Sequence, residues 1–212
     1  MTKNTFLGSI KEEAISGWKL YKILPSITGA QASLESANGT SKLAKEANNI
    51  FGIKGSYNGQ SYLHDTWEVN KLGKRIETKD SFRKYPDIQT SIIDRGEFFT
   101  STPWRVENYK HVIGETSYKK AARALLKSVY ATDPQYANKL ISFIEQNKLY
   151  EWDKEAFQLD SSTTSNSYEK LVSQKQKSIV HDEKSQKEKQ NLSKVLKTGS
   201  LYAIRSIINK FK

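Results

Sequence analysis

Cysteine is absent from the 212-residue sequence, which excludes disulfides, thiolate metal sites and cysteine nucleophiles. Histidine is scarce as well. His64, His111 and His181 stand far apart and form no pair with the spacing of zinc ligands. We therefore expect no metal site in this chain.

Long apolar runs are also missing. No stretch approaches the roughly 18 consecutive apolar residues that a membrane-spanning helix needs, so we expect no integral membrane protein. Residues 1–11 contain no apolar run as long as that of a signal peptide, so no secretory leader is expected. With 11% aromatic residues the chain can still build a hydrophobic core, and full-length disorder is not expected.

Acidic residues are outnumbered: 34 Lys and Arg face 23 Asp and Glu, giving a net charge of +11. A basic protein is attracted to polyanions, which include nucleic acid, anionic lipid and the teichoic acids of bacterial walls, or it simply has a basic surface. Zinc-finger spacing, an RNP-type aromatic motif and a basic recognition helix are all missing. We therefore predict no nucleic-acid partner.

The composition changes near residue 153. Residues 1–152 hold all four tryptophans, all four prolines and ten of the eleven glycines, and we predict that they form one folded domain. Residues 153–167 are predicted to be a flexible linker, because the run from 160 is Asp, Ser, Thr and Asn. Residues 168–212 are predicted to form a basic helical segment. Its end, 201–212, is amphipathic and suits binding to a wall or membrane surface, or packing against the chain's own domain.

Periodicity within the first domain predicts an α+β fold. Apolar spacing over 4–24 is helical and stops at Pro25, and a second helix is expected over 27–36. Between 57 and 85 the pattern alternates and contains an Asn-Gly turn, which predicts a small antiparallel sheet. Helical patterns then return after Pro86. We expect a mostly helical lobe, a β-hairpin lobe and a cleft between them.

Glu35 is the first candidate for chemistry. It lies at the end of the second predicted helix, beside the apolar stripe of Ile27, Ala30 and Leu34. The negative end of the helix dipole and partial burial both raise the pKa of a carboxyl, which suits a general acid. The alternative is an ordinary solvated glutamate at a helix end.

Glu68 is the second candidate. In the alternating strand it lies on the face opposite Leu63, Trp67 and Val69, so packing of that apolar face on the domain would turn Glu68 toward the cleft. Two carboxylates facing each other across a groove are the arrangement of glycoside hydrolysis. Glu77, on the next strand, is a rival for this role.

Several motifs, in order, resemble one family. They are ITGAQASLESANG at 27–39, NNIFGIKG at 48–55, FRKYP at 82–86 and YATDPQY at 130–136. They closely resemble the bacterial glucosaminidase family typified by the flagellar peptidoglycan hydrolase domain, which is glycoside hydrolase family 73 of the lysozyme superfamily. The resemblance covers about residues 10–150.

The resemblance implies a lysozyme-like fold and assigns roles to seven positions. The general acid would be Glu35, the second carboxylate Glu68 and an active-site tyrosine Tyr130. Residues lining the cleft and binding substrate would be Asn49, Phe51, Gly52 and Tyr136. Ala37 departs from the family, which often has glycine there.

The resemblance also implies an activity: an endo-β-N-acetylglucosaminidase that hydrolyses the glycan strands of bacterial peptidoglycan. No cofactor is expected, because proton transfer and charge stabilisation carry such a reaction. Two alternatives stay open, a muramidase or lytic transglycosylase of the same superfamily and a non-catalytic wall-binding protein. Without a leader, the chain is expected to be made in the cytoplasm and to act on the wall, either as a phage endolysin or as an enzyme exported by another route.

Overall fold

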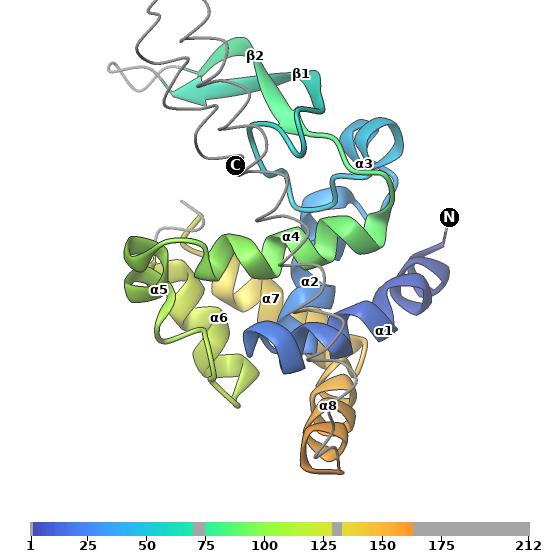
Figure 1. Cartoon of the computed structure of the whole chain (residues 1–212), viewed down its shortest axis with the longest axis vertical. Coiled ribbons are helices and arrows are strands. Elements are labelled where there is room, and N and C mark those ends of the chain that lie inside the picture. Colours follow the sequence, from blue (N-terminus) through green and yellow to red (C-terminus); the bar gives the residue numbers. More distant parts are fainter. Residues whose placement is uncertain (1, 70–74, 129–132, 163–212) are drawn as a thin grey trace, which may run out of the picture. The chain divides into compact units, whose positions relative to one another are not determined.

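A computed structural model describes residues 2–69, 75–128 and 133–162 (Figure 1). These residues belong to one compact unit that ends at Ser162. The predictions for Tyr130 and for 168–212 lie outside the described residues. The elements, in chain order, are α1 (Lys3–Tyr21), α2 (Pro25–Ser36), α3 (Lys42–Ala47), β1 (Ser61–Val69), β2 (Arg75–Arg83), α4 (Ile88–Thr100), α5 (Pro103–Tyr109), α6 (Tyr118–Lys127), α7 (Tyr136–Gln146) and α8 (Tyr150–Ser162).

Helix α2 lies at the centre of the helical lobe, where it contacts α1, α7 and α8 (Figure 1). Every residue from Pro25 to Ser33 is buried. Small side chains make this close packing feasible. A Cβ atom on Gly29 would lie 2.7 Å from the Trp152 ring of α8, so only glycine fits there without movement of its neighbours.

The N-terminus of α2 is capped from α8. The Asp153 carboxylate accepts hydrogen bonds from the Ser26 backbone N–H at 2.8 Å and from the Ser26 hydroxyl at 2.6 Å. Asp153 is buried, and this desolvation raises its pKa to about 6, against the opposing effect of the two hydrogen bonds. A residue remote in sequence thus completes the start of the central helix.

Helix α8 occupies residues for which the sequence predicted a flexible linker. Asp153 and Ala156 are buried, and Asp160 accepts hydrogen bonds from Lys22 at 2.7 Å and from the Trp18 indole at 3.3 Å. The linker prediction is therefore wrong for residues 153–162, because polar residues there are used in helix packing. Residues 163–167 lie outside the described residues.

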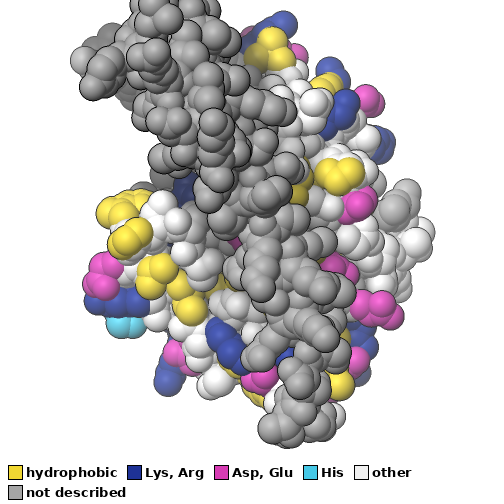
Figure 2. Space-filling model, viewed as in Figure 1, with side chains coloured by type: hydrophobic (Ala, Val, Ile, Leu, Met, Phe, Trp, Pro, Cys, Tyr) yellow, Lys and Arg dark blue, Asp and Glu magenta, His cyan; other side chains and the backbone are white. Residues whose placement is uncertain are grey.

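In the part of the chain that the structure describes, the helices are too short or too polar for any of them to cross a membrane. On the face shown in Figure 2, basic and acidic side chains lie interspersed over the helices. The surface therefore carries both signs of charge, although the chain as a whole is basic.

Strands β1 and β2 form a two-stranded antiparallel sheet, in a register that pairs Ser61 with Arg83 and Val69 with Arg75. Its inner face packs on α3, where Tyr62 and Phe82 contact Leu43 and Ala47. Helices around α2 and a separate hairpin lobe confirm the predicted α+β, lysozyme-like class. One detail is corrected: Leu63, expected on the packed face, is 62% exposed, because Tyr62 and Phe82 take that place.

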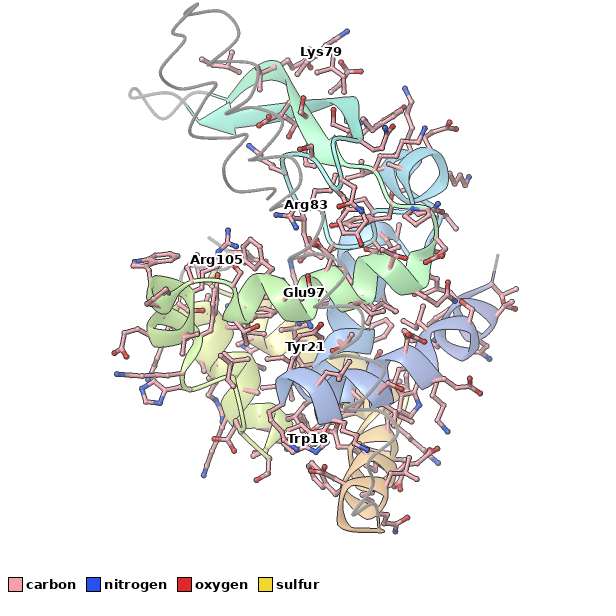
Figure 3. The ribbon with its side chains drawn as sticks, in the orientation of Figure 1. Trp18, Tyr21, Lys79, Arg83, Glu97 and Arg105 are labelled. Carbon is pink, nitrogen blue, oxygen red and sulfur yellow. The ribbon has the colours of Figure 1, made fainter. Side chains whose placement is uncertain are left out.

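The base of the hairpin is fixed to α4. Arg83, at the end of β2, donates to both carboxylate oxygens of Asp94 at 2.6 Å, and the Tyr85 hydroxyl donates to Asp94 at 2.6 Å. Figure 3 shows Arg83 between the hairpin and α4. Asp94 is buried, so this ion pair is shielded from solvent on one side and holds the two lobes together.

We expect Asp153→Asn to remove one part of the pH dependence of stability. Because the pKa of Asp153 is about 6 in the folded protein and 3.8 ordinarily, its ionisation is easier in the unfolded chain. Its contribution to the free energy of unfolding is complete below about pH 4 and lost as the pH rises to about 6, an effect of about 3 kcal/mol. Asparagine stays neutral at every pH. Between about pH 4 and about pH 6, the free energy of unfolding of the wild type should therefore fall by this amount relative to that of the variant, as denaturant unfolding measures.

Asp160→Asn is the control for this measurement. The hydrogen bond from Lys22 lowers the pKa of Asp160, so its contribution has the opposite sign and is lost as the pH falls. If the free energies of unfolding of wild type and Asp153→Asn differed by a constant amount across this pH range, the prediction would be contradicted.

Candidate active site

Glu35 lies in the last turn of α2, and the way that this helix ends fixes its position. The Ser36 hydroxyl donates to the Ala32 carbonyl at 2.5 Å and accepts from the Gly39 N–H at 2.7 Å. Ala37 ends the helix in the left-handed conformation, with φ at 51°. That conformation favours glycine and costs an alanine about 1 kcal/mol, which explains why the family often has glycine at this position.

A chain of hydrogen bonds leads from α4 to the Glu35 carboxyl. The Tyr136 hydroxyl, at the start of α7, donates to Glu35 Oε1 at 2.8 Å. The Gln31 amide donates to the Tyr136 oxygen at 2.9 Å, and Arg95 donates to the Gln31 carbonyl oxygen. Arginine can only donate, so the amide oxygen of Gln31 must face it and the amide NH₂ must face Tyr136. Each donor therefore points toward Glu35.

Arg95 begins this chain from a buried position in α4, with 1% of its surface exposed. Its guanidinium carbon lies 5.0 Å from the centre of the Phe51 ring and 4.8 Å from that of the Phe99 ring. It also donates to the Thr28 hydroxyl at 3.2 Å. Aromatic faces and neutral acceptors thus surround the cation, and its charge acts on Glu35 through a medium of low dielectric constant.

Two opposing influences set the pKa of Glu35. Desolvation is the larger one and raises the pKa, while the hydrogen bond from Tyr136 and the charge of Arg95 lower it. The residue nevertheless remains exposed, although protein atoms surround its carboxyl group. An exposed glutamate whose partly desolvated carboxyl keeps its proton to a higher pH than usual has the properties of a general acid.

Two of the residues predicted to bind substrate, Asn49 and Phe51, have buried side chains. Asn49 is buried, donates to the Ile53 and Arg83 carbonyls and accepts from the Ile53 N–H, so its amide ties this loop to the hairpin base. Phe51 is buried against Arg95. Gly52 follows Phe51, is exposed and has φ of 66°. The described contacts of Asn49 and Phe51 lie inside the fold, and the role of these two residues and of Gly52 in substrate binding stays a prediction.

The other predicted residues fall into two groups. Tyr136, predicted to bind substrate, is the residue whose hydroxyl contacts Glu35. Tyr130 lies outside the described residues, and so does the side chain of Glu68, whose backbone pairs with Ile76 in the sheet. Glu77 is exposed on β2. The role of either glutamate as the second carboxylate stays a prediction.

Sequence reasoning missed Arg95, although a signal was present. In α4, Arg95 comes three residues after Ile92 and four before Phe99, and both of these are buried. A cation on the apolar stripe of a helix indicates a buried charge with a specific task. The described residues contain no group of three or more side chains suited to hold a metal ion.

We expect Tyr136→Phe to raise the pKa of Glu35 further. The substitution removes the hydrogen bond that stabilises the carboxylate, while desolvation remains. Titration of the glutamate carboxyl carbons by NMR measures this change. Tyr118→Phe is the matched control, because its hydroxyl bonds to Glu145 instead. A Glu35 pKa that stays constant or falls in Tyr136→Phe would contradict the assigned hydrogen bond.

Comparisons with known proteins fit this geometry. The glucosaminidase family model, described as mannosyl-glycoprotein endo-beta-N-acetylglucosaminidase, matches residues 11–149. The exo-glucosaminidase LytG of Bacillus subtilis is 43% identical over 153 residues, which are 72% of this chain and 54% of LytG. The peptidoglycan hydrolase FlgJ of Escherichia coli K12 is 33% identical over 124 residues, which are 56% of this chain and 38% of FlgJ.

A solved structure agrees with both. The catalytic domain of the autolysin Auto from Listeria monocytogenes superimposes with a TM-score of 0.66 at 36% identity, covering 71% of this chain and 86% of that domain. The chain spans about half of LytG and less of FlgJ. Since the family model matches well over half of the sequence, this chain belongs to the glucosaminidase family and has its lysozyme-like fold.

Proposed function

We propose that this chain is a peptidoglycan hydrolase that cleaves the glycan strands of bacterial walls, with Glu35 as the general acid. The observation that carries the proposal is Glu35 itself, an exposed residue whose carboxyl has a pKa raised by desolvation and accepts a hydrogen bond from Tyr136. The names of the relatives support the substrate. LytG is called an exo-glucosaminidase and FlgJ a peptidoglycan hydrolase.

The hydrogen-bond chain determines which oxygen carries the acidic proton. The Tyr136 oxygen already accepts from Gln31, so its own proton is directed to Glu35 Oε1. The proton of the neutral acid then resides on Oε2, and this is the oxygen we assign to protonate the glycosidic oxygen of the substrate. As the bond to the leaving sugar breaks, the charge on the new carboxylate is stabilised by Tyr136 and by the field of Arg95.

The other half of the reaction needs a group that activates water or stabilises the oxocarbenium-like transition state. We assign this role to Glu68, with Glu77 as the alternative, because both belong to the hairpin that forms the second lobe. The proposed linkage is the one after N-acetylglucosamine. A relative from Lactococcus lactis, 36% identical over 135 residues, is named a probable N-acetylmuramidase, so cleavage of the other linkage is the second candidate.

We expect Glu35→Gln to reduce hydrolysis of purified peptidoglycan by about 10²–10⁴-fold, because glutamine cannot supply the proton. Mass spectrometry of the reduced fragments identifies the sugar at the new reducing ends, and we expect N-acetylglucosamine. Glu46→Gln, at an exposed glutamate in α3, is the control and should retain full activity. Glu68→Gln and Glu77→Gln, measured alongside, would identify the second carboxylate.

Retention of activity in Glu35→Gln within a few-fold of wild type would refute the assignment of the acid. N-acetylmuramic acid at the new ends would instead select the muramidase alternative. Absence of turnover by the wild type on several wall types would favour a wall-binding protein without catalytic activity.

We further propose that residues 168–212 bind anionic wall polymers or a membrane surface. The basis is the basic, amphipathic sequence of this segment. Deletion of 163–212 removes no residue of the unit that ends at Ser162. We therefore expect unchanged hydrolysis of purified soluble glycan and weaker lysis of whole cells. Equal lysis by the shortened and full-length proteins would contradict the proposed targeting role.

A further inference from the structure

A groove of about 680 Å³ lies between α5, α6 and the loop that joins them, on elements other than those that carry Glu35 and its hydrogen-bond chain. In Figure 2, apolar, acidic, basic and histidine side chains lie together on the left of the molecule, where Figure 1 places α5. The groove is open to solvent and lined mainly by charged and polar residues. Its chemistry therefore differs from that of an apolar ligand pocket.

Three cations of α6 line one wall of this groove: Lys120, Arg123 and Lys127. Their spacing of three and four residues places them on one face of the helix, while Ala121, Ala122 and Leu125 are buried on the other. All three cations are exposed. Within the described part of the chain, none of them forms a hydrogen bond or an ion pair, so their charges are not neutralised by the fold.

The two carboxylates of the groove are already occupied. Glu107 forms an ion pair with Lys110, which also lines the groove. Glu115 accepts the backbone N–H groups of Thr116 and Ser117, both at 2.9 Å, just before α6 begins. Neither carboxylate is bonded to a cation of α6. The groove thus keeps an excess of positive charge and attracts anions.

The rim of the groove carries Trp104, which is 69% exposed. It stands in the first turn of α5, where Pro103 and a capping hydrogen bond from the Arg105 N–H to the Thr102 hydroxyl fix the helix start. The Asn108 amide donates to the Ser128 carbonyl at 3.1 Å and joins α5 to the end of α6. An exposed indole on a fixed wall offers an apolar face on which a sugar ring can stack.

We propose that this groove binds an anionic polymer of the cell wall, one with phosphodiester groups along its backbone and sugar substituents. The cations of α6 extend over about 10 Å of helix, because seven residues separate the first from the last. That spread suits repeated charges along a polymer better than one small anion. The phosphates contact the α6 cations and a sugar stacks on Trp104. This inference rests on the proposed function, which places the enzyme in the wall.

Binding of two triple variants to insoluble walls tests the proposal. The groove variant is Lys120→Gln, Arg123→Gln, Lys127→Gln. The matched control, Lys3→Gln, Lys42→Gln, Lys45→Gln, removes the same charge from exposed lysines far from the groove in sequence. Both are made in the full chain with Glu35→Gln, so that the walls stay intact. Co-sedimentation is measured with Gram-positive walls before and after hydrofluoric acid has removed their phosphodiester polymers.

We expect the groove variant to bind untreated walls about tenfold more weakly than the parent, since three exposed ion pairs are lost, and the control to bind within about twofold of it. On stripped walls the three proteins should bind alike. Trp104→Ala should weaken binding to untreated walls only. Equal binding by the groove and control variants would overturn the proposal, and so would a loss that persists on stripped walls.

Hydrolysis of stripped peptidoglycan, measured with Glu35 intact, separates this inference from the proposed function. The groove variant should retain wild-type activity there, because its substitutions are exposed and outside the catalytic site. A wild type that binds untreated walls through the groove but does not hydrolyse stripped peptidoglycan would refute the proposed function and leave the groove assignment standing. Reduced hydrolysis in the groove variant alone would overturn the groove assignment.

Discussion

The buried guanidinium of Arg95 is the interaction on which the geometry of the site depends. A cation in the interior has a high desolvation cost, and it is retained here between two aromatic rings with hydrogen bonds to neutral acceptors. Because it can only donate, it fixes the orientation of the Gln31 amide, and Gln31 in turn directs the Tyr136 hydroxyl toward Glu35. One buried charge thus sets the donor direction of every hydrogen bond from Arg95 to Glu35.

The central helix α2 has an acid of raised pKa near each end, and a comparison of the two separates structure from chemistry. Desolvation is the main cause of both shifts. Asp153 is 4% exposed, and both of its oxygens are bonded to Ser26, so it can act only within the fold. Glu35 is exposed and has one oxygen beyond its bond to Tyr136. A raised pKa therefore indicates a catalytic acid only where substrate can reach the group.

Local features of the fold could be predicted from the sequence, and contacts between distant residues could not. Helix α2 was predicted over 27–36 and begins two residues earlier, at Pro25. The Asn58-Gly59 turn has positive φ at both residues, as a type I′ turn requires. Gln31 and Tyr136, by contrast, are 105 residues apart and Ser26 and Asp153 are 127 apart. Periodicity reports only which face of an element is apolar, so it finds Glu35 on its helix but not the partners that set its protonation. The linker prediction for 153–162 was wrong for the same reason, because the partners of Asp153 and Asp160 lie far away in the sequence.

Helix α6 shows how binding and catalysis can be varied independently in this fold. Its inner face, with Ala121, Ala122 and Leu125, packs in the core against α7, the helix that carries Tyr136. Its outer face carries the exposed cations of the groove. Substitutions on the outer face can change affinity for an anionic polymer without moving Tyr136, whereas the inner face is constrained by close packing. The two faces of α6 thus have separate roles: the inner face helps to position α7 and Tyr136, and the outer face sets the charge of the groove.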